Sequence, residues 1–158
     1  PYSVGHGQAI YDHKPSAYRH KYVDAPTRNL FEFGYGLSYT TFKYDKPRLT
    51  KSIISAAETT SVSVNVSNTG DVRGDEIVQL YIRDNYSQVT RPVKELKGFK
   101  KINLAPNESK MVTFKITPDM LAYYDLDMNY VVEPGKFTLM VGSSSRNSDL
   151  KKAYLEVK

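Results

Sequence analysis

The amino-acid sequence predicts an all-β protein, an antiparallel sandwich of two sheets with an irregular N-terminal extension. Three observations lead to this fold class. Apolar residues alternate with polar ones over short stretches, turn residues separate these stretches, and no stretch of about a dozen residues has the 3.6-residue apolar period of a helix. About eight short strands over ~120 residues are expected, as in two-layer β-sandwiches.

Residues 1–29 are predicted to form the irregular extension. Glycines and prolines interrupt every window before a helical or an alternating period can form. They are Pro1, Gly5, Gly7, Pro15 and Pro26. This part of the chain is therefore expected to lack regular secondary structure.

An aromatic strip follows the extension. Its apolar side chains share one parity and are Phe31, Phe33, Tyr35, Leu37 and Tyr39. A period of two predicts extended backbone with these side chains along one edge. Gly34 and Gly36 lie between them and can adopt backbone conformations closed to other residues. Because a contiguous apolar patch on a soluble chain usually marks an interaction site, we expect the strip to be a docking surface.

The first predicted strands of the sandwich follow in order. One covers residues 39–45. The next alternates inward valines with outward serines before a turn at residues 68–71, and its valines are Val62, Val64 and Val66. A third strand directs Val78, Leu80 and Ile82 to one face and Ile77, Gln79 and Tyr81 to the other. Because both faces carry large side chains, we expect this strand to be central.

The remaining elements are predicted from the same alternation. Residues 94–104 show mixed parity, which indicates a bulge near Gly98. A helical turn is expected at residues 118–124, with Thr117 as its N-cap and Pro118 in its first position. A short strand at residues 129–133 precedes a turn at Pro134. The inward residues of the other strands are Val112, Phe114 and Ile116, then Phe137, Leu139 and Val141, and finally Ala153, Leu155 and Val157.

Composition argues against several classes of function. The 158 residues carry a net charge of +5 and no cysteine, and no apolar run approaches the ~20 residues that cross a bilayer. No signal-peptide pattern opens the chain, so any export signal is expected outside it. Lysines such as Lys94, Lys97, Lys110 and Lys115 stand singly between apolar residues, which indicates a solvated sheet face. We therefore expect neither nucleic acid nor a membrane as a partner.

No metal or cofactor site is predicted. His6, His13 and His20 are spaced by seven, but this spacing gathers ligands only on a helix, and the extension is not one. Asp125 and Asp127 imitate the start of a calcium loop whose glycine and final glutamate are replaced. A polar hairpin connection explains them better. Nucleophile motifs are absent, and the neighbours Asp75 and Glu76 should point to opposite faces, so no pair of catalytic carboxylates is expected.

Four segments together resemble the C-terminal end of glycoside hydrolase family 3, the β-glucosidase family. They are residues 31–42, 68–84, 91–109 and 134–145, with the sequences FEFGYGLSYTTF, NTGDVRGDEIVQLYIRD, RPVKELKGFKKINLAPNES and PGKFTLMVGSSS. The resemblance implies an immunoglobulin/fibronectin type III-like sandwich over residues 38–158. It also implies that residues 1–37 are the tail of a preceding α/β sandwich domain plus a linker.

The resemblance also implies a function. The family's nucleophilic Asp lies in a barrel domain and its acid/base Glu in the α/β domain, and neither motif is in this chain, so no catalytic residue is assigned and Glu32 is not one. The chain is expected to be inactive alone and to act as a structural and docking domain of an enzyme that hydrolyses terminal β-D-glucosyl residues. Its expected partners are the barrel and α/β domains, with self-association through the aromatic strip as a further expectation.

Two further expectations complete this interpretation. The family implies a secreted or periplasmic enzyme. The alternative function is a free-standing immunoglobulin-like module that binds carbohydrate or protein through loops such as residues 85–90.

Overall fold

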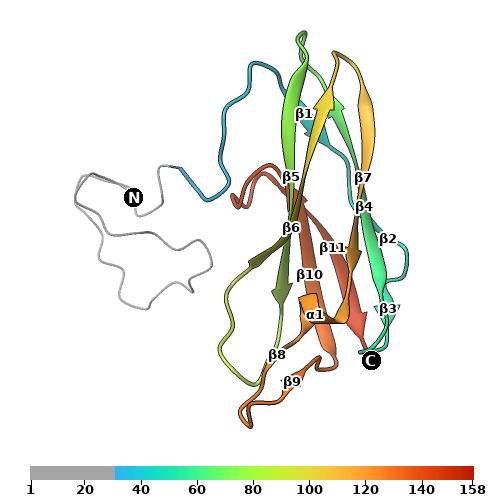
Figure 1. Ribbon diagram of the computed structural model, residues 1–158, viewed down its shortest axis with the longest axis vertical. Helices are drawn as coiled ribbons and strands as arrows, with labels where there is room; N and C mark the ends of the chain where they lie inside the picture. Colours follow the sequence, from blue (N-terminus) through green and yellow to red (C-terminus); the bar gives the residue numbers. More distant parts are fainter. Residues whose placement is uncertain (1–30) are drawn as a thin grey trace, which may run out of the picture.

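The computed structural model describes residues 31–158, which form a β-sandwich (Figure 1). The predictions for residues 1–29, including His6, His13 and His20, therefore lie outside the described residues. The elements are β1 (Phe42–Tyr44), β2 (Arg48–Leu49), β3 (Ile53–Ile54), β4 (Thr60–Asn68), β5 (Gly74–Asp84), β6 (Glu95–Leu104), β7 (Ser109–Ile116), α1 (Pro118–Leu121), β8 (Tyr123–Tyr124), β9 (Tyr130–Val131), β10 (Gly135–Gly142) and β11 (Leu150–Val157).

Two sheets pack face to face. One has the strand order β3-β11-β10-β5-β6, and in the other β4 pairs with β1, β2 and β7. A separate hairpin, β8–β9, lies beside α1 at one end of the sandwich (Figure 1). Within residues 31–158 no helix is long and apolar enough to cross a membrane. The predicted fold class, an antiparallel two-sheet sandwich, is therefore confirmed.

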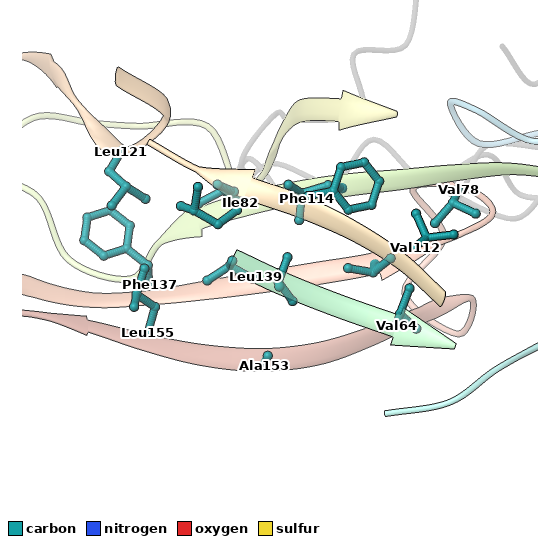
Figure 2. Packing of buried hydrophobic residues seen from close by; sticks show 14 of the residues in the cluster. Val64, Val78, Ile82, Val112, Phe114, Leu121, Phe137, Leu139, Ala153 and Leu155 are labelled. Atoms are coloured by element: carbon teal, nitrogen blue, oxygen red, sulfur yellow. The ribbon is translucent and has the colours of Figure 1, made fainter. Parts of the chain in front are cut away.

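The core lies between the sheets and follows the predicted parity. Val62, Val64 and Val66 of β4 are buried, whereas Ser63 is only partly buried. On the outer face the hydroxyl groups of Ser63 and Thr113 form a hydrogen bond. Figure 2 shows Val64 among buried side chains from both sheets. Each fully buried Val or Leu contributes roughly 1.5–3 kcal/mol, so a slip of one residue in register would expose the whole set.

Strand β5 is central, as predicted, because β10 and β6 flank it. Its inner residues join the main core, and its outer face is also covered. Tyr81 is fully buried there in a second small cluster with Met140 and Leu150, against which Leu96 packs. This outer cluster lies on the face where the N-terminal part of the described chain meets the sandwich.

Strands β6 and β7 form neighbouring edges of the two sheets. The register of β5 against β6 shifts between Leu80 and Tyr81, opposite Gly98 and Leu96, so the predicted bulge near Gly98 is confirmed. The Lys100 ammonium of β6 donates a hydrogen bond of 2.6 Å to the backbone carbonyl of Thr113 in β7. One charged side chain therefore reaches from one edge strand to the other.

Several sequence predictions need correction. The first strand starts at Phe42 and the helical turn ends at Leu121, so both are shorter than predicted. Thr117 makes no side-chain cap hydrogen bond. Strands β2, β3 and β8 have two residues each and were missed, because a two-residue strand has no period. Strand β3 also pairs parallel with β11, in an otherwise antiparallel sandwich.

Candidate docking site

The candidate site is the junction, defined here as residues 31–41, which carries the aromatic strip into β1. The strip is not the regular extended segment that its alternation predicted. The backbone turns where the Tyr35 amide donates to the Glu32 carbonyl at 3.0 Å, and Gly34 has a φ of +77°. Only glycine adopts such a φ readily, so a turn at Gly34 breaks the period.

Gly34 is held against the sandwich by Gln79 of β5. The Gln79 amide nitrogen donates to the carbonyls of Gly34 at 3.1 Å and of Ser143 at 2.5 Å. The Gln79 amide oxygen accepts the buried Tyr81 hydroxyl at 2.5 Å. A Cβ at Gly34 would lie 2.1 Å from that oxygen. Position 34 therefore requires glycine both for its φ and for the close approach of Gln79.

The loop between β10 and β11 holds the next part of the junction. The Ser145 amide donates to the Phe33 carbonyl at 2.8 Å. The Lys94 ammonium in turn donates to the Ser145 carbonyl and, at 2.9 Å, to the Asn147 side chain. Lys94 is only 8% exposed, and burial lowers its pKa. The prediction that Lys94 lies on a solvated face is wrong, since its ammonium is a buried support for this loop.

A cationic side chain closes the junction from outside. Arg146 donates to the Glu32 carboxylate at 3.3 Å, and its guanidinium lies 5.3 Å from the centre of the Tyr35 ring. The Phe31 and Tyr35 rings are 5.3 Å apart. The ion pair between Arg146 and Glu32 is partly exposed, so it contributes little to the stability of the fold. It holds the Arg146 guanidinium over the Tyr35 ring.

The end of the junction is anchored to β4. The Thr40 hydroxyl donates to the Asn68 amide oxygen at 2.6 Å. Asn68 also receives the Gly70 amide and donates to the carbonyls of Val72 and Leu104. A single buried asparagine therefore joins the junction to two turns at this end of the sandwich.

The side chains of the strip remain accessible although the backbone is fixed. Their exposed fractions are 62% for Phe31, 47% for Phe33, 38% for Tyr35, 89% for Leu37 and 102% for Tyr39. Gly36 has no positive φ and has open space where a Cβ would stand, so the backbone argument holds for Gly34 alone. The junction thus presents an apolar surface on an ordered backbone.

The other candidate residues lie elsewhere. Asp75 and Glu76 point to opposite faces, as predicted: Asp75 pairs with exposed Lys101, and Glu76 accepts the Tyr44 hydroxyl at 2.6 Å between the sheets. Burial raises the pKa of Glu76. Asp125 forms the predicted polar hairpin connection between β8 and β9. In the described part of the chain no group of three or more acidic or histidine side chains is arranged to hold a metal ion.

Sequence reasoning missed the residues that fix the junction. The alternation places Gln79 only on the outer face of its strand, and no sequence pattern marks Arg146. One signal was available for the basic residues, since Lys94 and Arg91 stand together in the RPVK segment. Arg91 is also largely buried and donates to Asp84 at 3.3 Å and to Glu95 at 2.8 Å. The two cations hold the two ends of this segment on the sandwich.

Comparison with known proteins agrees with this architecture. The model of the fibronectin type III-like domain matches residues 76–145. A β-xylosidase from Formosa agariphila is 56% identical over 82% of this chain, and a periplasmic β-glucosidase from Salmonella typhimurium is 39% identical over 92% of it. The matches cover 18% and 20% of those two proteins.

Solved structures give the same result. A β-glucosidase from Erythrobacter marinus has a TM-score of 0.87 and 39% identity over 95% of this chain. A β-glucosidase from Listeria innocua has a TM-score of 0.84 and 33% identity over 94% of it. The chain spans about a fifth of the length of these relatives. It belongs to the fibronectin type III-like, C-terminal region of glycoside hydrolase family 3.

Proposed function

We propose that this chain is a non-catalytic structural domain that docks onto the preceding domains of a β-glycoside hydrolase. In this proposal residues 38–158 are the fibronectin type III-like domain, and residues 1–37 are the end of the preceding α/β domain and the linker. The names of the relatives indicate β-glucosides or β-xylosides as substrates of the parent enzyme. The aromatic strip is the proposed contact.

The observation that carries the proposal is the contrast between backbone and side chains at the junction. Gln79 and Ser145 hold the backbone carbonyls of Gly34 and Phe33, and Asn68 holds the Thr40 side chain. Leu37 and Tyr39 stay almost fully exposed. Where the backbone is already held, binding costs little additional backbone entropy, and the main ordering cost is the rotamer freedom of the exposed side chains. Five exposed apolar side chains between Phe31 and Tyr39 are typical of an interaction site.

A comparison of two proteins tests the docking role. Leu37→Ser combined with Tyr39→Ser should leave the unfolding free energy of the 158-residue chain within about 0.5 kcal/mol, because both side chains are exposed there. In the full parent enzyme the same change should lower the unfolding temperature of the domain, since each buried side chain contributes roughly 1.5–3 kcal/mol. Met111→Ser is the control, because Met111 is 69% exposed on the outer face of the other sheet. An equal response in both proteins would contradict docking.

Activity measurements test the non-catalytic role. The purified chain should not hydrolyse an aryl β-glucoside or an aryl β-xyloside, because hydrolysis requires a nucleophile and an acid/base that face each other across a cleft. Turnover that survives purification and disappears on replacement of one carboxylate of this chain would overturn the proposal. Affinity of the isolated chain for an oligosaccharide would instead favour the free-standing binding module.

A further inference from the structure

A second apolar surface lies at the end of the sandwich, on the β8–β9 hairpin beside α1 (Figure 1). We call it the hairpin tip, and its residues are Tyr124, Leu126, Met128 and Tyr130. Leu126 and Met128 are each 73% exposed. None of these four residues belongs to the main core cluster, and the hairpin is separate from both sheets of the sandwich. The tip therefore presents apolar side chains that the domain's own core does not require.

Hydrogen bonds within the loop hold the backbone of the hairpin tip. The Asp125 carboxylate accepts the amides of Asp127 at 2.9 Å and Asn129 at 2.8 Å, and the Asp125 carbonyl accepts the Met128 amide at 3.2 Å. These bonds close the five-residue loop of residues 125–129 between β8 and β9. The rings of Tyr124 and Tyr130 are 5.0 Å apart. The tip is thus a preorganised projection, which reduces the entropy lost when a partner binds it.

The hairpin is also fixed to the sandwich. The Arg91 guanidinium lies 4.8 Å from the centre of the Tyr123 ring and donates to the Leu121 carbonyl at 3.3 Å. The Tyr130 hydroxyl donates to the Asp119 carbonyl at 3.1 Å. Leu121 itself is buried in the core. The hairpin is therefore joined to the core through Arg91 and Leu121.

Met128 stands in a backbone conformation that disfavours it. Its φ is +62°, and a hairpin-loop position with such a φ usually holds glycine or asparagine. A non-glycine residue there carries a conformational cost, and an exposed side chain recovers none of it inside this domain. Met is an adaptable apolar side chain that suits a binding surface. The strain and the exposure together indicate a contact outside this chain.

We propose that the hairpin tip is a second docking element, which inserts into an apolar pocket on the rest of the parent polypeptide. This inference rests on the proposed function, because the junction must tether that polypeptide. The chain spans only about a fifth of its relatives, so a much larger body is available as occupant. Exposed Asp127 beside the apolar side chains indicates a pocket with a basic rim.

A tethered partner fits this surface better than a second copy. Two half-exposed rings and two aliphatic side chains present far less than the roughly 800 Å² per partner of a standard protein interface. A linked partner has an effective concentration in the millimolar range, so a small contact is sufficient. A free copy of the chain has no such advantage.

Hydrogen exchange measured in the isolated chain and in the full parent enzyme tests the proposal. The amides of Met128 and Asn129 should exchange at least 10-fold more slowly in the parent. The Tyr35 amide reports junction docking separately. Protection of Tyr35 without protection at the tip would overturn this inference and leave the proposed function intact. Protection at neither place would refute both, and protection at the tip of the isolated chain that rises with concentration would identify a second copy instead.

A substitution separates binding from folding. Met128→Gly removes the apolar side chain and relieves the positive φ, so the isolated chain should be equally or more stable. In the parent, Met128→Gly combined with Leu126→Ser should abolish the 10-fold protection at Asn129. Met111→Ser, with similar exposure on another face, should leave that protection unchanged. Retained protection at Asn129 in the double variant would overturn the proposal.

Discussion

Replacing Gly34 by alanine should open the junction without unfolding the sandwich. Alanine at a φ of +77° costs roughly 1–2 kcal/mol. Its Cβ would also displace Gln79, since this Cβ and the Gln79 amide oxygen would lie only 2.1 Å apart. The hydrogen bond that the buried Tyr81 hydroxyl donates to Gln79 would then be lost, at a cost of about 0.5–1.5 kcal/mol. Together these effects are about 1.5–3.5 kcal/mol.

The chain can avoid most of this cost by releasing the junction from the sheet. The predicted effect is therefore local. A penalty of about 2 kcal/mol raises the population of the released junction roughly 30-fold. The amides of Tyr35 and Ser145, which donate to Glu32 and Phe33, should exchange faster by at least ~10-fold. The unfolding free energy of the sandwich itself should change by less than about 0.5 kcal/mol.

Gly36→Ala is the matched control. Gly36 lies two residues away, has no positive φ and has open space around the site of a Cβ. Its replacement should leave both amide exchange rates unchanged. If Gly34→Ala and Gly36→Ala gave the same exchange rates, neither the φ nor the contact with Gln79 could be what holds the junction.

Three further changes have expected outcomes. Burial raises the pKa of Glu76, so the folded state holds its proton more tightly than the unfolded state, and the unfolding free energy should fall as pH rises from about 4.5 through that raised value. Glu76→Gln keeps an acceptor for the Tyr44 hydroxyl and should remove this fall, as measured by urea unfolding between pH 4 and 7.5. An unchanged pH profile would contradict the assignment of the fall to Glu76. Arg91→Ala should lower the unfolding free energy by about 3–5 kcal/mol, because the Asp84 side chain is only 3% exposed and loses its cation. Lys101→Ala, which removes an exposed ion pair with Asp75, should lower it by less than ~1 kcal/mol. Equal losses in the two variants would refute the distinction between buried and exposed pairs. Leu139→Ala, at a fully buried position, should cost about 2–5 kcal/mol in denaturant unfolding, and a loss below ~1 kcal/mol would argue against the core assignment.

The fold could be predicted where one face of a strand is buried and the other is not. Strand β4 is the clear case, because Val62, Val64 and Val66 alternate with residues that meet solvent. Strand β10 shows the limit of this signal, since Thr138 and Met140 are buried along with the predicted Leu139. There the outer face is covered as well. Two-residue strands such as β3 depend on tertiary pairing and leave no pattern in the sequence.

At the junction, only the apolar residues could be predicted from the sequence. Alternation found the side chains of the aromatic strip, but it gave a wrong backbone, because Gly34 turns the chain between Phe33 and Tyr35. The groups that hold the junction are polar and far away in sequence. Gln79 looks like an outward strand residue, and Lys94 looks like any surface lysine until the β10–β11 loop covers it. Long-range polar contacts of this kind have no local sequence signature.

The hydrogen bond between Lys100 and Thr113 has a consequence for aggregation. An open edge strand is a template on which a strand of another molecule can pair, and the backbone of β7 offers such a template beyond its pairing with β4. An added strand would have to take the Thr113 carbonyl from the Lys100 ammonium and strip water from that charge. The bridge therefore opposes the addition of an intermolecular strand at the centre of β7.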